Sequence, residues 1–563
     1  MKPSRSDLLS ATPLALAALA SVWTPAALAQ TPPDVGRVLQ QMKTPPEPAA
    51  KKASVPSLPA TPAERFAPGG AKVVVRSFVF GGNQSIGSEA LNAVLAEALG
   101  KPADMAALGR LTETVSDFYH ASGYPFARAY LPPQEVSKGV VKIEVQEGRF
   151  GEVLAKGKDP FWVARTQAFL APLKTGELIK TAGLERATLL LDDLPGAKFV
   201  PVMQPGDKVG TGDLQVIEER GKRLSGQVGA DNYGNRYTGA YRFNAAANLN
   251  SPFLMGDQLS LASTVTDEAL WFGSANYALP LGGSGLRANA GVMHTQYTLG
   301  SDFKASNTTG TADIYSAGVS YPLVRSTKTN LKLVLNYQHK ELHEDVNGSV
   351  TNKRSDVVPL SAEFEVRDSL GGGGVTYGSA GVTYGNLRLP SDQLAADVNR
   401  TDGSFTKANA DVMRVQGLPE NFSLFARAGG QWAGNNLDSS EKLSLGGASG
   451  VRAFPNGEAL GDMGWVAQLE LRKAIGSFAP YVFMDAGGIQ VNQSSRSPWQ
   501  HRGNPRPHAY TPQRGPPISA GWPGARAGGC PGTGGLSRAT RRGAGSVRCQ
   551  EPPDTLPQES PPS

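Results

Sequence analysis

The sequence predicts two small α+β domains followed by an antiparallel transmembrane β-barrel. Three observations indicate this fold class: an export signal at the start of the 563 residues, one series of strands and helices that occurs twice over residues 73–222, and a long succession of alternating apolar and polar segments over residues 223–493. In outer-membrane strands one face meets lipid and the other meets a watery lumen, so apolar and polar residues alternate.

Residues 1–29 have the composition of a cleavable signal peptide. Lys2 and Arg5 form a basic start, an Ala- and Leu-rich apolar stretch follows, and the Ala-Leu-Ala triplet at 27–29 matches the site that signal peptidase cleaves. A membrane anchor is the alternative, but Pro13 interrupts the short apolar stretch. No later segment offers the ~20 uninterrupted apolar residues of a spanning helix. We therefore expect an exported chain.

Residues 30–72 form a Pro-rich linker that contains one short stretch with helical periodicity. Asp34 can cap this helix. Apolar residues then recur at i, i+3, i+4 and i+7, namely Val35, Val38, Leu39 and Met42. Composition alone favours the alternative, a terminus without fixed structure.

Residues 73–148 and 149–222 each predict one small domain with the order β-α-α-β-β. In the first domain we expect strands at 73–80, 126–131 and 139–145 and helices at 91–98 and 108–118. In the second domain we expect strands at 151–155, 199–203 and 213–218 and helices at 161–172 and 184–191. Because the same unit recurs, each copy supports the other.

Residues 223–493 predict about thirteen amphipathic strands. From Leu331 to Tyr337, for example, apolar residues at odd positions alternate with mostly polar residues at even positions. Alternation alone fits any half-buried antiparallel sheet. A long run of such segments in an exported body without cysteine favours an outer-membrane barrel.

Residues 494–563 differ from the rest of the chain. They contain nine Arg, no Lys and three acidic residues, so they account for the whole net charge of +6. Both cysteines, Cys530 and Cys549, also lie there. The basic balance is therefore no argument for a nucleic-acid partner, and no disulfide framework is expected in the main body.

Several ordered motifs between residues 73 and 493 resemble those of one known family. The segments GYPFARAYLPPQ (123–134) and VKIEVQEG (141–148) are similar to the end of a periplasmic POTRA domain, and DNYG (231–234) is similar to a first barrel hairpin. GVRAFP (450–455) resembles a loop that folds back into a barrel lumen, and FMDAG (483–487) resembles the strand that faces it. The chain thus resembles the two-partner secretion transporters (TpsB family) of the hemolysin and filamentous-hemagglutinin exporter type, within the outer-membrane assembly superfamily.

The resemblance implies a lumenal-loop lock in which Arg452 meets Asp485. A guanidinium and a carboxylate pair bidentately, which suits the fixing of a loop tip. Asp485 shares its strand face with Phe483 rather than with Met484, so we expect it to point inward. An incidental charge pair in a hairpin loop is the alternative. The implied lock residues are Arg452, Phe454, Phe483, Asp485 and Gly487, and the implied loop motif adds Gly450, Val451, Pro455, Gly457 and Glu458.

The resemblance also implies location, function and partners. It implies POTRA domains in the periplasm and a barrel of about 16 strands in the outer membrane, which is wide enough for an aqueous channel. The channel would secrete a large exoprotein with a secretion-domain N-terminus, captured unfolded at the strand edges of the POTRA domains. Residues 34–42 would plug the channel. The other implied partners are outer-membrane lipid, the barrel-assembly machinery and periplasmic chaperones; no cofactor and no nucleic acid is implied.

Other function classes fit less well. A barrel-assembly insertase also has POTRA domains, but two copies and the VRAFPxGE form of the loop argue against it, and the periplasmic repeat argues against a porin. No GxSxG elbow and no Walker-type loop occurs, so we expect no enzyme. His339 and His343 would lie ~13 Å apart on a strand, too far to share one metal.

We predict that residues 494–563 result from a frameshift between Val491 and Ser495. Family members continue with about three more strands and end on an aromatic residue, whereas thirteen strands leave two unpaired edges in lipid. A disordered tail is the alternative. Translation of the other two reading frames beyond codon 493 should yield alternating strands that end in Phe, Tyr or Trp. Their absence, together with secretion by this 563-residue product, would contradict the prediction.

Overall fold

The computed structural model describes residues 33–42, 69, 71–136, 138–457, 459–476 and 478–494. The expected signal peptide, most of the linker and residues 495–563 lie outside these residues. Within the described ranges, no helix is long and apolar enough to cross a membrane.

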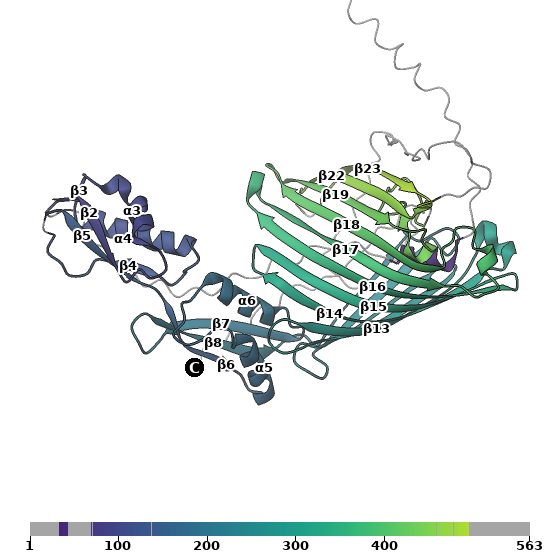
Figure 1. The fold of residues 1–563 in the computed structure, drawn as a ribbon, viewed down its shortest axis with the longest axis horizontal. Coiled ribbons are helices and arrows are strands. Elements are labelled where there is room, and N and C mark those ends of the chain that lie inside the picture. Colours follow the sequence, from purple (N-terminus) through teal and green to yellow (C-terminus); the bar gives the residue numbers. More distant parts are fainter. Residues whose placement is uncertain are drawn as a thin grey trace, which may run out of the picture. The chain divides into compact units, whose positions relative to one another are not determined.

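The first small domain is an α+β unit, as expected (Figure 1). Its elements are β1 (Val73–Val74), β2 (Ser77–Gly81), α3 (Ser88–Val94), η1 (Ala96–Ala98), β3 (Pro102–Ala103), α4 (Met105–Ala121), β4 (Arg128–Tyr130) and β5 (Val140–Gln146). The sheet has the order β2-β5-β4, with β2 and β5 parallel. Leu91, Val115 and Tyr119 cover it and are fully buried with Val141 and Ile143. Burial of these apolar side chains stabilises the domain.

One expected strand of this domain is wrong. Residues 73–80 do not form a continuous strand, because the chain leaves β1 at Val75 and starts β2 at Ser77. The N–H of Val75 donates to Lys101 O and its carbonyl accepts from Gly100 N, so the chain passes from pairing with β3 to pairing with β5. The short strand β3 had no period-two pattern from which it could be predicted.

The second small domain repeats this arrangement. Its elements are β6 (Arg149–Lys156), α5 (Pro160–Leu170), α6 (Thr181–Asp192), β7 (Ala197–Pro205) and β8 (Thr211–Arg220). The sheet order is β6-β8-β7. Asp159 caps α5, and Pro160 occupies the first helical position, where its missing N–H costs nothing. Leu170, Leu184 and Leu214 are fully buried between the helices and the sheet.

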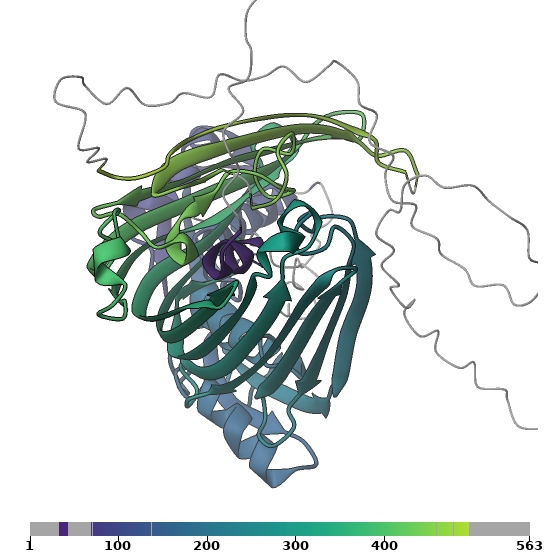
Figure 2. The same ribbon diagram turned by 90° about the vertical axis from the view of Figure 1, so that its right-hand side faces the viewer.

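The remaining described chain forms one antiparallel sheet of thirteen strands, which confirms the predicted fold class. The strands are β9 (Leu224–Asp231), β10 (Arg242–Asn250), β11 (Gln258–Thr266), β12 (Ala269–Pro280), β13 (Arg287–Thr298), β14 (Thr309–Arg325), β15 (Thr329–Val346), β16 (Ser349–Asp368), β17 (Gly374–Arg388), β18 (Gly403–Gly417), β19 (Phe422–Ala433), β22 (Met463–Lys473) and β23 (Tyr481–Gln490). Consecutive strands pair, and β9 and β23 are the two edges of the sheet as far as it is described. Figure 2 shows the sheet curved around an interior.

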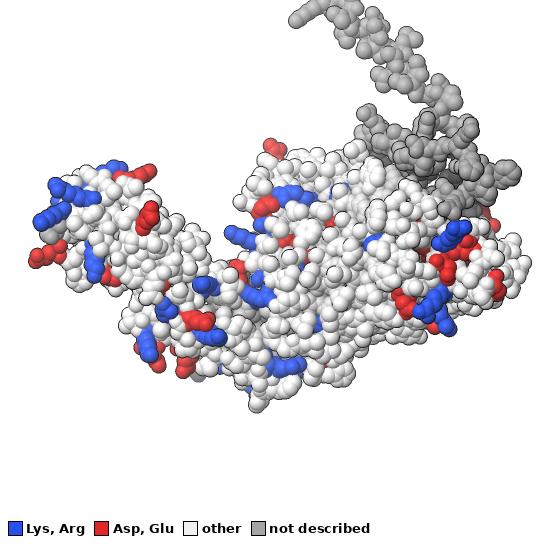
Figure 3. Space-filling model, viewed as in Figure 1, with Lys and Arg blue, Asp and Glu red and all other residues white. Residues whose placement is uncertain are grey.

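The two faces of this sheet differ as the alternation predicts. On β15, Leu335 and Tyr337 are 44% and 46% exposed, whereas Lys340 on the opposite face is 8% exposed. The apolar face is therefore the outer wall, and the polar face lines the lumen. Figure 3 shows few charged side chains over the middle of the visible wall and more toward the strand ends. We call the end at which the chain enters β9 from β8 proximal, and the opposite end distal.

Candidate functional site

A long loop leaves the distal end of β19 and returns at the distal end of β22. This lumenal loop (residues 434–462) contains η5 (Ser439–Glu441), β20 (Leu443–Ser444) and β21 (Leu460–Gly461). Leu445 and Val451 of the loop form a buried cluster with Val466 and Ile489 of the adjacent strands. The loop therefore packs against the inner wall of the sheet instead of projecting into solvent.

Arg452 joins the loop to the inner wall. Its backbone N–H, Nε and Nη2 donate to the Asp485 carboxylate at 3.1, 2.7 and 2.6 Å, and its Nη1 donates to Glu470 Oε1 at 2.6 Å. The guanidinium lies 3.8 Å from the centroid of the Phe483 ring. Burial opposes the charge, but the bonds to Asp485 and the nearby Glu470 outweigh it and raise the pKa of Arg452 above its usual range. The charged pair is therefore maintained.

Glycine permits the close approach of loop and wall. A Cβ on Gly487 would lie 2.4 Å from Leu445 Cδ1 and 3.1 Å from Val451 Cγ2, and a Cβ on Gly450 would lie 2.1 Å from Leu445 O. Phe454 packs beside the same apolar cluster. The structure thus brings together the loop tip and the FMDAG strand named from the sequence.

The other loop-motif residues shape the turn after the tip. The carbonyl of Pro455 lies 2.1 Å from the position of a Cβ on Gly446, so glycine is needed opposite it. Gly457 has a φ of +79°, which glycine adopts without strain. Glu458 lies outside the described residues.

The helix expected near the N-terminus is present as α2 (Val35–Gln41). Asp34 caps it by accepting from Arg37 N at 2.9 Å. Val35 and Val38 are buried with Leu270, Tyr297 and other side chains from the inner wall. Figure 2 shows this helix (purple) inside the curved sheet. It therefore occupies part of the lumen.

Helix α2 also contacts the lumenal loop. Gln40 Nε2 donates to the carbonyl of Ser440. A Cβ on Gly36 would lie 2.2 Å from Ser439 Oγ and 2.3 Å from Ser440 N. A Cβ on Gly457 would lie 2.6 Å from Gln41 Nε2. The helix thus fits against both the start of the loop and the turn after its tip.

Buried ion pairs hold the start of the loop, a cluster that sequence reasoning missed. Glu441 pairs with Lys340 and Lys407 at 2.5 and 2.7 Å, and Asp438 pairs with Lys353 at 2.7 Å. Burial would raise the pKa of Asp438, but the Lys353 ammonium and hydrogen bonds with Ser440 hold it below its usual range. The only sequence signal was lysine on the lumen-facing positions of amphipathic strands. No local motif links those lysines to Asp438 or Glu441.

The two strand histidines have separate partners. His339 Nδ1 contacts Asp356 at 2.8 Å, and His343 Nδ1 contacts Asn352 at 2.7 Å. Among the described residues, no group of three or more His, Cys, Asp or Glu could hold a metal ion.

Comparison with known proteins agrees with this architecture. Residues 210–501 match the family described as haemolysin secretion/activation protein ShlB/FhaC/HecB, and residues 73–148 match the ShlB-type POTRA domain. The heme/hemopexin transporter protein HuxB of Haemophilus influenzae strain 86-028NP is 28% identical over 429 residues, covering 74% of this chain and 75% of that protein. The outer membrane transporter CdiB of Escherichia coli is 24% identical over 460 residues, covering 77% of this chain and 74% of that protein.

A solved structure has the same fold. The structure of CdiB from Escherichia coli superimposes with a TM-score of 0.59 and 22% identity, covering 78% of this chain and 84% of that chain. This likeness agrees with the two POTRA-type domains, with the large antiparallel sheet and with the family match, which covers more than half of the chain. The chain therefore belongs to the haemolysin secretion/activation family, the outer-membrane transporters of two-partner secretion, with its POTRA domains in the periplasm.

Proposed function

We propose that this protein secretes one large exoprotein, which its POTRA domains capture unfolded and its lumen conducts outward, and that α2 and the lumenal loop close the lumen at rest. The observation that carries this proposal is the position of α2 within the lumen, against a loop that ion pairs and the Arg452–Asp485 contact fix to the wall. A wide pore needs such a closure because it would otherwise leak.

The POTRA sheets support the capture step. In the first domain β2 and β4 are edge strands, and in the second domain β6 and β7 are edge strands. Edge strands can accept an extended chain through backbone hydrogen bonds, which require no strict client sequence. This mode suits an unfolded polypeptide that reaches the periplasm.

Gly36→Leu is expected to open the channel. A leucine side chain would collide with Ser439 and Ser440, and overpacking of this kind costs about 1–3 kcal/mol. Displacement of α2 should become roughly 5- to 100-fold more populated, since 1.4 kcal/mol is about tenfold. Single-channel recording in planar bilayers measures the open fraction, and release of a co-expressed exoprotein into the medium measures function.

Gly87→Leu is the matched control. Gly87 lies in the first POTRA domain and has nothing within 4 Å of the position of its Cβ. It should leave conductance unchanged. An unchanged open fraction in Gly36→Leu would remove α2 as the closing element. An exoprotein retained in the periplasm of cells that carry the protein with its reading frame restored beyond residue 493 would refute secretion itself.

A further inference from the structure

A row of polar and charged side chains crosses the outer wall of the barrel. This polar row consists of His294, Asp313, Glu341, Arg354 and Arg388, which are consecutive register partners from β13 to β17. His339 and Asp356 continue this polar surface on the proximal side of the row, and His343 and Asn352 continue it on the distal side. Farther proximally the outer wall is apolar, so the row belongs to the boundary between a lipid-facing surface, where charged side chains are costly, and a polar one.

The strand alternation and the exposure place this row on the lipid-facing side. His294 is two residues from Val292, and Asp313 is two residues from Tyr315; Val292 and Tyr315 are 52% and 50% exposed. The neighbouring residues on the lumen face are not exposed, since Tyr297 and Ala312 are fully buried against the region of α2. The polar row and α2 thus lie on opposite faces of the same strands.

The row lies toward the distal ends of the strands, which are the extracellular ends. Toward the proximal side the outer wall becomes aromatic and aliphatic. The exposed residues there include Tyr337, Val358, Tyr384, Leu335, Leu360 and Val382. Glu341 is six residues beyond Leu335 on β15, which corresponds to about 20 Å along the strand at ~3.4 Å per residue. The row thus lies distal to the exposed aromatic residues Tyr337 and Tyr384, which is the order expected where acyl chains give way to headgroups.

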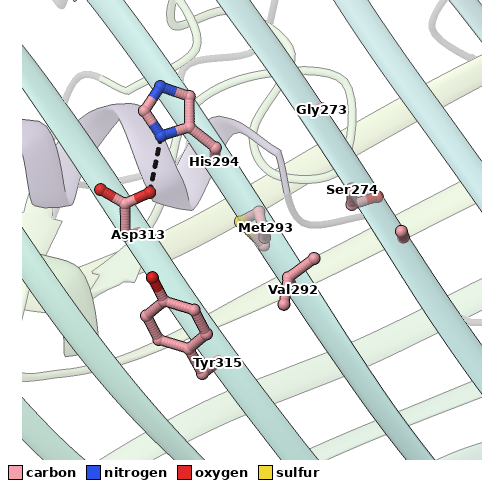
Figure 4. Close-up of a pocket in the computed structure, with 8 residues that line it drawn as sticks. Gly273, Ser274, Val292, Met293, His294, Asp313 and Tyr315 are labelled. Atoms are coloured by element: carbon pink, nitrogen blue, oxygen red, sulfur yellow. Dashed lines mark hydrogen bonds and ion pairs between the residues drawn. The ribbon is translucent and has the colours of Figure 1, made fainter.

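A shallow groove runs beside the row. It has a volume of about 430 Å³ and its walls include Val292, Tyr315, Gly273 and Ala275. Figure 4 shows His294 and Asp313 together at one end of this depression, with Val292 and Tyr315 on its sides. The groove exists because β12 has only small side chains at Gly273 and Ala275. An apolar groove on this wall fits an acyl chain.

The polar row has the chemistry of a headgroup site. His294 Nδ1 lies 2.6 Å from Asp313 Oδ1, and Arg354 Nε lies 3.4 Å from Glu341 Oε1. These side chains are paired yet open to ligands, since those of His294 and Arg354 are 38% and 69% exposed. Guanidinium groups bind phosphate bidentately, whereas carboxylates and imidazoles accept from sugar hydroxyls.

We propose that this wall binds one phosphorylated glycolipid of the outer leaflet. An acyl chain occupies the groove, the sugars lie along the polar row, and a phosphate contacts Arg354 and Arg388. Three strand spacings separate His294 from Arg354, about 14 Å at ~4.8 Å each. A sugar headgroup of two or more rings spans that distance, whereas the headgroup of a glycerophospholipid is too small to do so.

Native mass spectrometry of the full chain in detergent micelles tests this site. The probes are a diphosphorylated, acylated glucosamine disaccharide, its dephosphorylated form and phosphatidylethanolamine. We expect one tightly retained equivalent of the diphosphorylated glycolipid and at least tenfold weaker retention of the other two. Equal retention of phosphatidylethanolamine would overturn the proposal, because it would indicate an unspecific lipid surface.

Two variants test the phosphate-binding part and the acyl-binding part of the site separately. R354A/R388A should reduce retention of the diphosphorylated glycolipid at least tenfold and leave that of the dephosphorylated form unchanged. G273L should weaken both glycolipids, because its side chain fills the groove. The control is Lys332→Ala, which removes a cation paired with Glu363 nearer the proximal ends of β15 and β16. Each variant is first shown to be folded by its heat-modifiable migration on gels. Unchanged retention by both folded variants would refute the site.

Discussion

In an intact version of this protein, with the reading frame restored beyond residue 493, Arg452→Ala is expected to reduce exoprotein secretion at least tenfold while the protein still inserts into the outer membrane. The substitution removes the two side-chain hydrogen bonds to Asp485 and the bond to Glu470, and leaves the Asp485 side chain, which is only 4% exposed, without its cation. Removal of one partner of a buried pair costs about 3–5 kcal/mol. A loss of about 3 kcal/mol would raise the population of the released loop tip more than 100-fold, since 1.4 kcal/mol is about tenfold. The backbone N–H of residue 452 still donates to Asp485, so the free-energy loss is smaller than that of removing the whole contact.

We expect the loss of secretion to depend on the contact between Arg452 and Asp485 and not on either residue alone. Asp485→Ala should reduce secretion similarly, and the double variant should be no worse than either single variant, because the two residues act through one contact. Arg414→Ala is the matched control, since Arg414 forms a bidentate pair with Asp368 near the proximal ends of β16 and β18, away from the loop. Exoprotein in the medium and heat-modifiable protein in outer-membrane fractions are measured together. Secretion at the wild-type rate by both single variants would exclude the lumenal-loop lock.

Deletion of residues 73–148 is expected to abolish binding of the unfolded exoprotein. The deletion removes the whole sheet β2-β5-β4 with its two edge strands. The second domain keeps its own buried core of Leu170, Leu184 and Leu214, and the thirteen-stranded sheet loses none of its strand pairs. Binding should therefore fall below detection, while the barrel stays heat-modifiable on gels.

Binding is measured between surface-immobilised protein and the urea-unfolded secretion domain of the exoprotein. Deletion of residues 34–42 is the control, because it removes α2 from the lumen but leaves both POTRA sheets intact. That control should bind the unfolded exoprotein as the full chain does. If the chain without residues 73–148 binds equally well, strand addition to the first POTRA domain is not the capture step.

Local sequence patterns were enough for the fold class and for most elements. Period-two alternation predicts the barrel strands, because it reflects the geometry of one segment. The cap at Asp34 and the helical spacing of apolar residues are consistent with α2, but composition favoured a terminus without fixed structure, and it was the family resemblance that implied a helix there. The alternation around Asp485 also predicts its inward direction. The break of residues 73–80 into β1 and β2 was missed, because it depends on pairing with β3, a distant two-residue strand.

The sequence by itself determined two α+β domains, an amphipathic antiparallel sheet and, through its motifs, the two segments that meet at Arg452 and Asp485. Only the tertiary structure decided which charges meet elsewhere. Lys340 and Glu441 are 101 residues apart, yet they pair because strand register and the inward fold of the loop bring them together. The same register aligns His294 with Asp313 on the outer wall. Alternation assigns a residue to a face, but its partners across the sheet are set by register and loop path, which no single segment encodes.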